Sequence, residues 1–381
     1  MTATLTGKVH TINIKSITLH RVCVPLIEPF RISNGTIAEK DAILIEVKTD
    51  DDVVGWGEAS PMSGSFYSND TPASSWVALS TLLIPEVLRN GPFDVNRFYE
   101  QLSTLPGDAF AKAGIEGAVW DASAQTLGLP LCQMLGTQAR PIPSGVAIGI
   151  YDQVAELLER VELYTAQGYR RVKIKIEPGW DIEPVAAVRS RFPDVPLMVD
   201  ANAAYTIADA ALFRELDAYG LLMIEQPLAR EAHAEAGELQ QQLRTPLCAD
   251  ESAESIEALA SLIANRAARI INIKVQRVGG LSAARLMFES ARAAGLECWV
   301  GTMPELGVAS AQGLHLAALD GFTYPTDIEA SSRWYVDDVI MPGIEIDTRG
   351  YIQLPAGPGM GYVVARDKVE RYSVGTVTFA N

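Results

Sequence analysis

Few cysteines, a shortage of basic residues and the absence of long apolar runs each exclude a class of protein. The 381 residues include four cysteines, Cys23, Cys132, Cys248 and Cys298, which lie far apart and form no CxxC pair. This spacing argues against a disulfide framework and against a zinc site. We therefore expect a cytoplasmic protein whose four thiols are buried and structural.

The sequence also lacks the features of a membrane or nucleic-acid partner. The longest uncharged stretch, residues 122–139, contains three Gln, two Gly and a Pro, so it does not suit a span of about 20 apolar residues. The N-terminal region has no apolar signal segment. With 31 basic against 47 acidic residues the net charge is −16, whereas phosphate binding requires clustered Lys and Arg. We predict neither a membrane nor a nucleic-acid partner.

The first 140 residues predict a small α+β domain. Residues 12–24 and 42–56 alternate apolar and polar side chains, as antiparallel strands do, with a turn at 50–52. Helical patterns follow at 73–89, 94–104 and 109–127. Strands followed by helices are typical of an α+β unit.

From residue 141 to residue 330 the pattern changes to alternating strands and helices. Apolar runs lie at 146–150, 171–176, 195–200, 221–225, 247–250, 270–275, 298–301 and, more weakly, 324–328. Amphipathic segments between them include 152–167, 183–192, 207–219, 256–264 and 282–294. This alternation predicts an α/β fold with a modified (β/α)8-type barrel, written (β/α)7β because the last unit is incomplete. Residues 331–381 are rich in Gly and Pro and are expected to pack back on the first domain.

Five charged residues each close an apolar run of the predicted barrel. They are Lys175, Asp200, Glu225, Asp250 and Lys274, at spacings of 25, 25, 25 and 24 residues. One β/α unit has about this length, so the five side chains should lie at one height on successive strands. Because barrel active sites lie at the carboxyl ends of the strands, the pattern predicts three carboxylates flanked by two lysines.

Three neighbouring carboxylates repel one another, and a divalent cation removes that repulsion. Ligands that are all oxygen favour a hard ion, so we expect Mg²⁺, with Mn²⁺ as the alternative. A lysine near a cation and another lysine loses its proton more easily and can act as a base. Lys173 lies on the same side of its strand as Lys175, where it could assist that lysine or hold the substrate carboxylate.

These lysines suit abstraction of a proton next to a carboxylate, through an enediolate, with Lys175 and Lys274 on opposite faces of the substrate. A Schiff base on a barrel lysine is the rival mechanism, but it requires no carboxylate triad.

With these residues the sequence resembles the enolase superfamily, in its muconate-lactonising subgroup, over nearly the whole chain. The resemblance implies Asp200, Glu225 and Asp250 as metal ligands and Lys175 and Lys274 as acid/base catalysts. It implies auxiliary roles for Lys173 and Asn202.

A closer resemblance is to the branch of N-acylamino acid (N-succinylamino acid) racemases and o-succinylbenzoate synthases. The string at 173–181, KIKIEPGWD, is similar to the motif of that branch. Its substrate-covering loops resemble residues 28–35, with Phe30, and residues 55–58 and 65–68, with Phe66 and Tyr67. Ordinary turns and interdomain packing are the alternative interpretation of both loops.

After the seventh strand the sequence departs from that branch. It reads GTMPELGVAS at 301–310, which keeps an acid at Glu305 but places Leu306 and Ser310 where the branch has a hydroxyl and an arginine. This loop, with Met303, is expected to line the substrate pocket.

The prediction is a Mg²⁺-dependent enzyme, an isomerase or lyase, that acts on a small carboxylate and racemises N-acyl (N-succinyl) amino acids. The alternatives are o-succinylbenzoate synthase, a muconate-type cycloisomerase and a dipeptide epimerase. An epimerase would use an acidic pair such as Asp327 and Glu329 to hold the substrate ammonium. A non-catalytic relative should have lost a ligand or a lysine, and none is lost here. The family resemblance implies a homo-oligomer.

Overall fold

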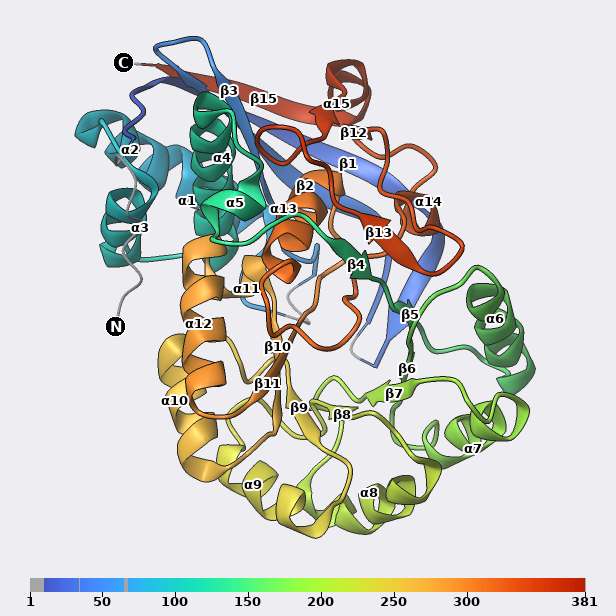
Figure 1. Cartoon of the computed structure of the whole chain (residues 1–381). Coiled ribbons are helices and arrows are strands. Elements are labelled where there is room, and N and C mark those ends of the chain that lie inside the picture. The colour runs from blue at the N-terminus through green and yellow to red at the C-terminus, as the bar shows by residue number, and fades with distance from the viewer. Residues whose placement is uncertain (1–9, 34, 65–67, 381) are drawn as a thin grey trace.

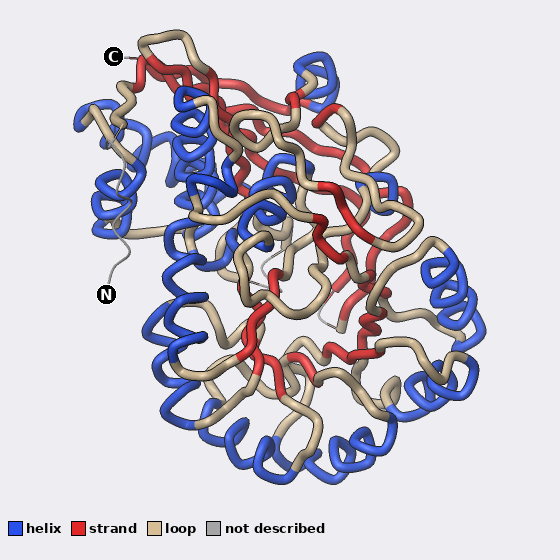
Figure 2. The backbone as a smooth tube through the Cα atoms, viewed as in Figure 1, coloured by secondary structure: helices blue, strands red, loops and turns tan. Residues whose placement is uncertain are grey.

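An antiparallel sheet with helices and a ring of parallel strands make up the computed structural model, which describes residues 10–33, 35–64 and 68–380 (Figures 1 and 2). The predicted α/β class, with a capping domain and a (β/α)7β barrel, is confirmed. No helix in this described part combines the length and hydropathy that a membrane span requires.

The capping sheet has the strand order β15–β1–β2–β3, and all its pairings are antiparallel. Its strands are β1 (Ile14–Ile32), β2 (Gly35–Thr49), β3 (Val54–Ala59) and β15 (Ser373–Ala380). The predicted turn at 50–52 joins β2 to β3, where Thr49 donates its N–H to the carbonyl of Val53. The expected loop at 28–35 is instead the end of the long β1–β2 hairpin, because Phe30 and Ile32 are still paired with β2.

Six helical elements follow β3, and one of them, α4, fills the space between the sheet and the barrel. They are α1 (Pro72–Ala78), the π-helical turn η1 (Leu79–Leu83), α2 (Ile84–Asn90), α3 (Val95–Thr104), α4 (Ala109–Leu127) and α5 (Leu131–Met134). The approach of α4 to β3 requires glycine, since a Cβ on Gly57 would lie 1.9 Å from the carbonyl oxygen of Gly114.

Seven parallel strands form the barrel wall, in the order β11–β10–β9–β8–β7–β6–β5. They are β5 (Val146–Ile148), β6 (Val172–Lys175), β7 (Leu197–Asp200), β8 (Ile224–Glu225), β9 (Leu247–Ala249), β10 (Ile270–Ile273) and β11 (Glu297–Val300). The register pairs Lys175 with Asp200 and Asp200 with Glu225. The expected common height therefore holds for these three residues. Glu225 is paired with Cys248, and Cys248 with Ile270, so Asp250 and Lys274 lie two and four residues further along the chain than that height.

The eighth predicted strand, residues 324–328, is irregular. Thr326 donates its N–H to the carbonyl of Pro143, and Asp327 donates its N–H to the carbonyl of Val300, so the segment still bridges β11 and the residues just before β5. Pro325 has no N–H to give, and the hydroxyl of Thr326 bonds to Val300 O at 2.7 Å. Pro325 and this side-chain hydrogen bond interrupt the regular ladder of backbone hydrogen bonds here.

Helices surround the barrel as the pattern predicted, with three additions, α9, α11 and α13. They are α6 (Val154–Ala166), α7 (Ile182–Arg191), η2 (Ile207–Asp209), α8 (Ala210–Leu216), η3 (Asp217–Tyr219), α9 (His233–Gln242), α10 (Ile256–Asn265), α11 (Val275–Val278), α12 (Leu281–Ala293) and α13 (Gly307–Ala317). The apolar pattern did not indicate α9, which buries one large apolar side chain, Leu239. It did not indicate α13 because every residue of that helix is buried, so no polar stripe marks a surface.

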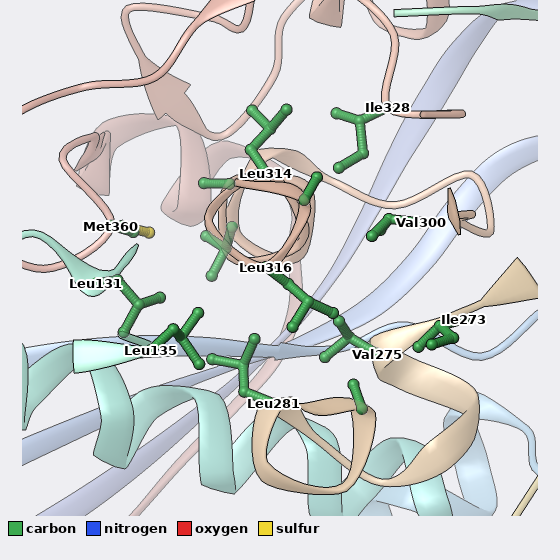
Figure 3. Packing of buried hydrophobic residues seen from close by; sticks show 14 of the residues in the cluster. Leu131, Leu135, Ile273, Val275, Leu281, Val300, Leu314, Leu316, Ile328 and Met360 are labelled. Carbon is green, nitrogen blue, oxygen red and sulfur yellow. The ribbon is translucent and has the colours of Figure 1, made fainter. Parts of the chain in front are cut away.

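Helix α13 lies in the largest apolar cluster, between the barrel and the capping domain. Figure 3 shows Leu314 and Leu316 among side chains from α5, α12, β10 and β11, including Leu131, Leu281 and Val300. Burial of a leucine side chain stabilises a fold by roughly 1.5–3 kcal/mol. The two parts of the chain are therefore joined by a continuous core.

The C-terminal segment crosses from the barrel to the capping sheet. Its elements are α14 (Ser331–Trp334), β12 (Ile340–Met341), β13 (Tyr351–Gln353), β14 (Val363–Val364), α15 (Arg366–Tyr372) and β15. β13 pairs with β4 (Pro141–Pro143), and β15 pairs with β1. All four cysteines are free thiols, and three are buried as expected, whereas Cys23 is half-buried.

Candidate active site

Three carboxylates meet at the carboxyl ends of β7, β8 and the segment after β9. Each of Asp200, Glu225 and Asp250 offers an oxygen atom, and these atoms all lie within 4.8 Å of one another. All three side chains are at most 1% exposed. Burial and the charge of Asp200 raise the pKa of Glu225 to about 8. The repulsion among these groups is thus only partly compensated by the protein.

A fourth carboxylate, Glu251, lies beside the triad. Its Oε1 accepts a hydrogen bond from Asn202 Nδ2 at 3.0 Å, while its buried Oε2 has no hydrogen-bond partner among the described residues. Burial and the charge of Asp250 raise the pKa of Glu251 to about 7. An all-oxygen donor set with surplus buried negative charge fits a hard divalent cation such as Mg²⁺. The residues present therefore suit the cation that the sequence implied.

Two lysines approach the triad from opposite sides. Lys175 on β6 donates to Asp200 Oδ2 at 2.5 Å, and Lys274, directly after β10, donates to Asp250 Oδ2 at 2.9 Å. β6 and β10 flank the three strands that lead to the carboxylates. Arg277 also holds Asp250, with its guanidinium 2.5 Å from Oδ1. Burial alone would raise the pKa of Asp250, but Arg277 and Lys274 lower it well below its usual range.

Lys173 is surrounded by three carboxylates. It donates to Glu225 Oε2 at 3.1 Å and to Asp327, and it lies 3.6 Å from Asp200. Burial alone would lower the pKa of Lys173, but Asp327 and Glu225 raise it well above its ordinary value. Lys173 is thus suited to hold charge in place and unsuited to accept a proton near neutral pH.

Asp327 is held by two cations. Arg171 donates to its Oδ1 at 2.6 Å, and Lys173 donates to its Oδ2. The guanidinium of Arg171 also lies 5.1 Å from the ring centre of Trp299 inside the barrel. The pKa of Asp327 is well below its usual range because these two cations outweigh the effect of burial. This carboxylate is consequently already neutralised within the protein.

A cavity opens over the lysines, with a mostly apolar wall. The lining comprises Phe30, Ile32, Met62, Ala147, Lys173, Lys175, Lys274, Thr302, Met303, Pro304, Asp327, Glu329 and Trp334. Phe30 comes from the end of the β1–β2 hairpin and packs edge-on against Trp334 at 4.9 Å between ring centres. The hairpin is fastened to the barrel rim, since Arg31 lies 3.1 Å from Asp152 and 3.3 Å from Glu177. The capping domain thus supplies one wall of the cavity.

The structure separates the expected specificity residues into two groups. Phe30, Met303 and Asp327 line the cavity, whereas Asn202 lies against Glu251 and does not line it. Phe66 and Tyr67 fall outside the described residues, so their expected contact with substrate stays a prediction.

Glu305 lines a smaller polar cavity that shares Met303 and Asp327 with the first. Its Oε1 accepts the N–H of Met303 at 3.2 Å. Burial and the nearby Glu58 raise the pKa of Glu305 to about 8. This acid therefore favours the protonated form near neutral pH and can donate a hydrogen bond.

Arg171 and Asn272 are site residues that the sequence analysis did not single out. Asn272 Nδ2 donates to Glu225 Oε1 at 2.7 Å. Both residues were detectable in principle, because each is polar and stands two positions before a charged residue of the same apolar run, Lys173 or Lys274. Met62 and Trp334, by contrast, come from segments without such a signal.

Comparisons with known proteins agree with this geometry. Residues 15–136 match the mandelate racemase/muconate lactonizing enzyme N-terminal domain, and residues 154–368 match the enolase C-terminal domain-like family. An o-succinylbenzoate synthase from Geobacillus stearothermophilus is 43% identical over 362 residues, which cover 95% of this chain and 96% of that protein. An N-succinylamino acid racemase from Amycolatopsis is 40% identical over 349 residues, 91% and 94% of the two chains.

A solved structure extends the similarity to three dimensions. An enolase-superfamily member from Listeria innocua superimposes with a TM-score of 0.93 at 34% identity, covering 97% of this chain and all of that one.

Proposed function

Because this chain belongs to the enolase superfamily, in its mandelate racemase/muconate lactonizing group, we propose that it racemises N-acyl amino acids such as N-succinyl amino acids. The observation that supports a racemase is the placement of Lys175 and Lys274 on opposite sides of one carboxylate triad. Inversion at a carbon requires one group on each face, and we assign that role to these two lysines.

In the proposed reaction each lysine handles one proton. Lys175 as the free amine removes the α-proton from one face of the substrate, and Lys274 as the ammonium returns a proton to the other face. The roles reverse for the opposite enantiomer. Lys173 remains charged and holds Glu225 and Asp327 in place.

Asp200, Glu225 and Asp250 would hold the divalent cation. When bound, such a cation supplies positive charge that stabilises the substrate carboxylate as negative charge develops on it. The apolar side chains of Phe30, Met303 and others exclude water from the cavity.

The test is α-proton exchange followed by NMR in D₂O with Mg²⁺. We expect N-succinyl or N-acetyl amino acids to exchange their α-proton and lose optical rotation. In Lys274→Ala, one enantiomer should still exchange its α-proton through Lys175, without inversion. In Lys175→Ala, the other enantiomer should still exchange its α-proton through Lys274. Absence of exchange on every N-acyl substrate with the unsubstituted protein would refute the racemase proposal.

A second candidate is o-succinylbenzoate synthase, favoured by the relative at 43% identity that carries this name. In that reaction Lys175 would remove a proton and water would leave from the same face, so Lys274 need not move a proton. Retention of dehydration by Lys274→Arg, which keeps the charge beside Asp250, would support this candidate. Loss of dehydration in Lys274→Arg, in a folded variant, would contradict it.

The contacts of the acidic pair argue against a dipeptide epimerase. Asp327 is held by Arg171 and Lys173, while Glu329 accepts the N–H of Ala147 at 2.8 Å and lies 3.4 Å from Arg333. A substrate ammonium would have to displace these partners. We accordingly expect no exchange on dipeptides.

A further inference from the structure

Gln226 directly follows Glu225, the central carboxylate of the triad, and it is buried in an unfavourable backbone conformation. Its φ of +36° lies in the left-handed region, which residues with a side chain rarely adopt. Asn202 and Ala203, which follow Asp200, have φ values of +42° and +62°. Thus three of the five non-glycine residues with positive φ in the described part of the chain lie within three positions of a triad carboxylate. Such strain persists only where surrounding contacts fix it, and it is concentrated at functional sites.

The side-chain amide of Gln226 uses its full hydrogen-bonding capacity. Its Oε1 accepts the N–H of Asp250 at 3.0 Å and the N–H of Ser252 at 3.1 Å. Its Nε2 donates to Ser252 Oγ and to the carbonyl of Leu228, both at 2.8 Å. Two acceptor sites and two donors are all that a glutamine side chain offers. The backbone that carries the Asp250 carboxylate is therefore held by this one side chain.

The backbone of Gln226 bonds to β9 and to the turn after β7. Its N–H donates to the carbonyl of Cys248 at 2.9 Å, and its carbonyl accepts the N–H of Ala203 at 2.8 Å. In the same turn Asn202 donates its N–H to Oδ1 of Asp200 at 2.9 Å. The strands β7, β8 and β9 are neighbours in the barrel wall (Figure 1). Gln226 thus contacts the segments of Asp200 and Asp250 while being joined to Glu225 directly.

We propose that Gln226 is a positioning residue that sets the spacing of the three carboxylates for the divalent cation. The inference rests on the cation site of the proposed function. Because the carboxylates repel one another, bonds from neighbouring groups must maintain their spacing before the cation binds. Gln226 does not line the cavity over the lysines, so its action on the site is through the ligands. Residues that orient metal ligands typically change the affinity for the metal about 10–100-fold when they are substituted.

Gln240 on α9 offers a matched control. It is also buried, its Oε1 accepts the N–H of Leu247 at 2.7 Å, and its Nε2 donates to the carbonyl of Thr245 at 3.2 Å. These bonds lie at the start of β9, whereas the side-chain bonds of Gln226 to Asp250 and Ser252 lie beyond the end of that strand. The two glutamines therefore make the same kinds of bond at opposite ends of one strand.

The test is Mn²⁺ binding to the full chain, followed by electron paramagnetic resonance. The signal of free Mn²⁺ gives the dissociation constant, and the spectrum of bound Mn²⁺ reports the symmetry of its ligands. We expect Gln226→Leu to raise the dissociation constant about 10–100-fold and to change the bound spectrum, whereas Gln240→Leu should leave both unchanged. Gln226→Gly should act like Gln226→Leu, although glycine adopts the left-handed backbone without strain. This second variant removes the side chain and keeps the fold.

Urea unfolding without the cation measures the stability of each variant, so that loss of binding is separated from loss of folding. Dissociation constants in both Gln226 variants equal to that of the unsubstituted chain would overturn the positioning role alone. Equal weakening by Gln240→Leu would also overturn it, because a general loss of stability would then explain the effect. If the unsubstituted chain binds no Mn²⁺, the cation site of the proposed function fails, and the positioning role fails with it.

Discussion

At the scale of single residues, Glu225 is the central carboxylate of the triad, and its removal should have a large effect on cation binding. We expect Glu225→Gln to weaken Mg²⁺ binding about a hundredfold or more, since even changes outside the ligand shell cost roughly 10–100-fold. Isothermal titration calorimetry measures this. Glu305→Gln is a matched control because it removes another buried acid with a raised pKa that lies outside the triad. Equal affinities of the two variants would contradict the ligand assignment.

Asp327 provides a second prediction at this scale. Removing one partner of a buried ion pair leaves the other charge uncompensated, which costs about 3–5 kcal/mol. Asp327→Asn should therefore lower the free energy of unfolding by about that amount, because Arg171 and Lys173 both lose their anion. Urea unfolding is the measurement, with Glu329→Gln as the comparison. A change below about 1 kcal/mol would indicate that Asp327 is not structurally paired.

The sequence predicted the site residues that recur once in each β/α unit. It missed the site residues that follow no such period. Lys175, Asp200 and Glu225 share one height because parallel strands with equal spacing keep register, so their period was readable. The pairing of Arg171 with Asp327 joins residues 156 positions apart through the irregular eighth segment. No local pattern encodes such a contact.

At the scale of elements, acids of the capping domain cap helices of the barrel. Glu116 on α4 accepts the N–H groups of Leu281 at 2.6 Å and Ser282 at 3.0 Å, at the start of α12. Glu58 on β3 likewise accepts the N–H groups of Leu306 and Ala309 at the start of α13. These bonds satisfy orphan helix donors and attach one domain to the other.

We expect Glu116→Ala to destabilise the protein by about 1–3 kcal/mol, since buried N–H groups lose their acceptor. It should also separate the unfolding of the two domains into two calorimetric transitions. Ser255→Ala is the control, because Ser255 caps α10 within the barrel through the N–H of Ala258. A single transition for both variants would show that this cap does not couple the domains.

Helices with one buried face and one exposed face could be predicted from the sequence. Helices α6, α10 and α12 pack one face on the barrel, so their apolar residues recur with the helical period. α13 is buried on all sides and α9 is polar on nearly all sides, and neither produces such a period. Residues 324–328 do not form the regular eighth strand that was expected, because Pro325 has no N–H to donate to a ladder of backbone hydrogen bonds.

At the scale of the whole molecule, the C-terminal segment is tied to both domains at Met360. Its N–H bonds to Asp121 of α4 at 2.8 Å, and its carbonyl accepts from His315 Nε2 of α13 at 3.0 Å. The other ring nitrogen, Nδ1, accepts the N–H of Cys132 at 3.1 Å. Because one ring nitrogen donates and the other accepts, this arrangement requires neutral histidine.

Protonation of His315 should therefore destabilise the fold. Burial lowers the pKa of His315 to about 4, against an ordinary value of 6.5. Above pH 6.5 both the folded and the unfolded state carry neutral histidine, and the stabilisation is complete. As the pH falls from 6.5 towards 4, the unfolded state binds the proton first, so the free energy of unfolding decreases. The contribution of His315 between pH 7 and pH 5 is about 2 kcal/mol.

Asp121 acts in the opposite direction, which decides how the experiment is designed. Burial raises the pKa of Asp121 to about 6, so its folded form binds a proton more readily than the unfolded chain, and its contribution falls as the pH rises through 6. The unsubstituted protein thus shows the sum of both effects.

We expect His315→Gln, whose amide can keep a donor and an acceptor, to lose less stability than the unsubstituted protein between pH 7 and pH 5. Urea unfolding at the two pH values measures the difference, and Asp121→Asn should change it with the opposite sign. Parallel pH profiles for His315→Gln and the unsubstituted protein would mean that the C-terminal tie does not depend on neutral histidine.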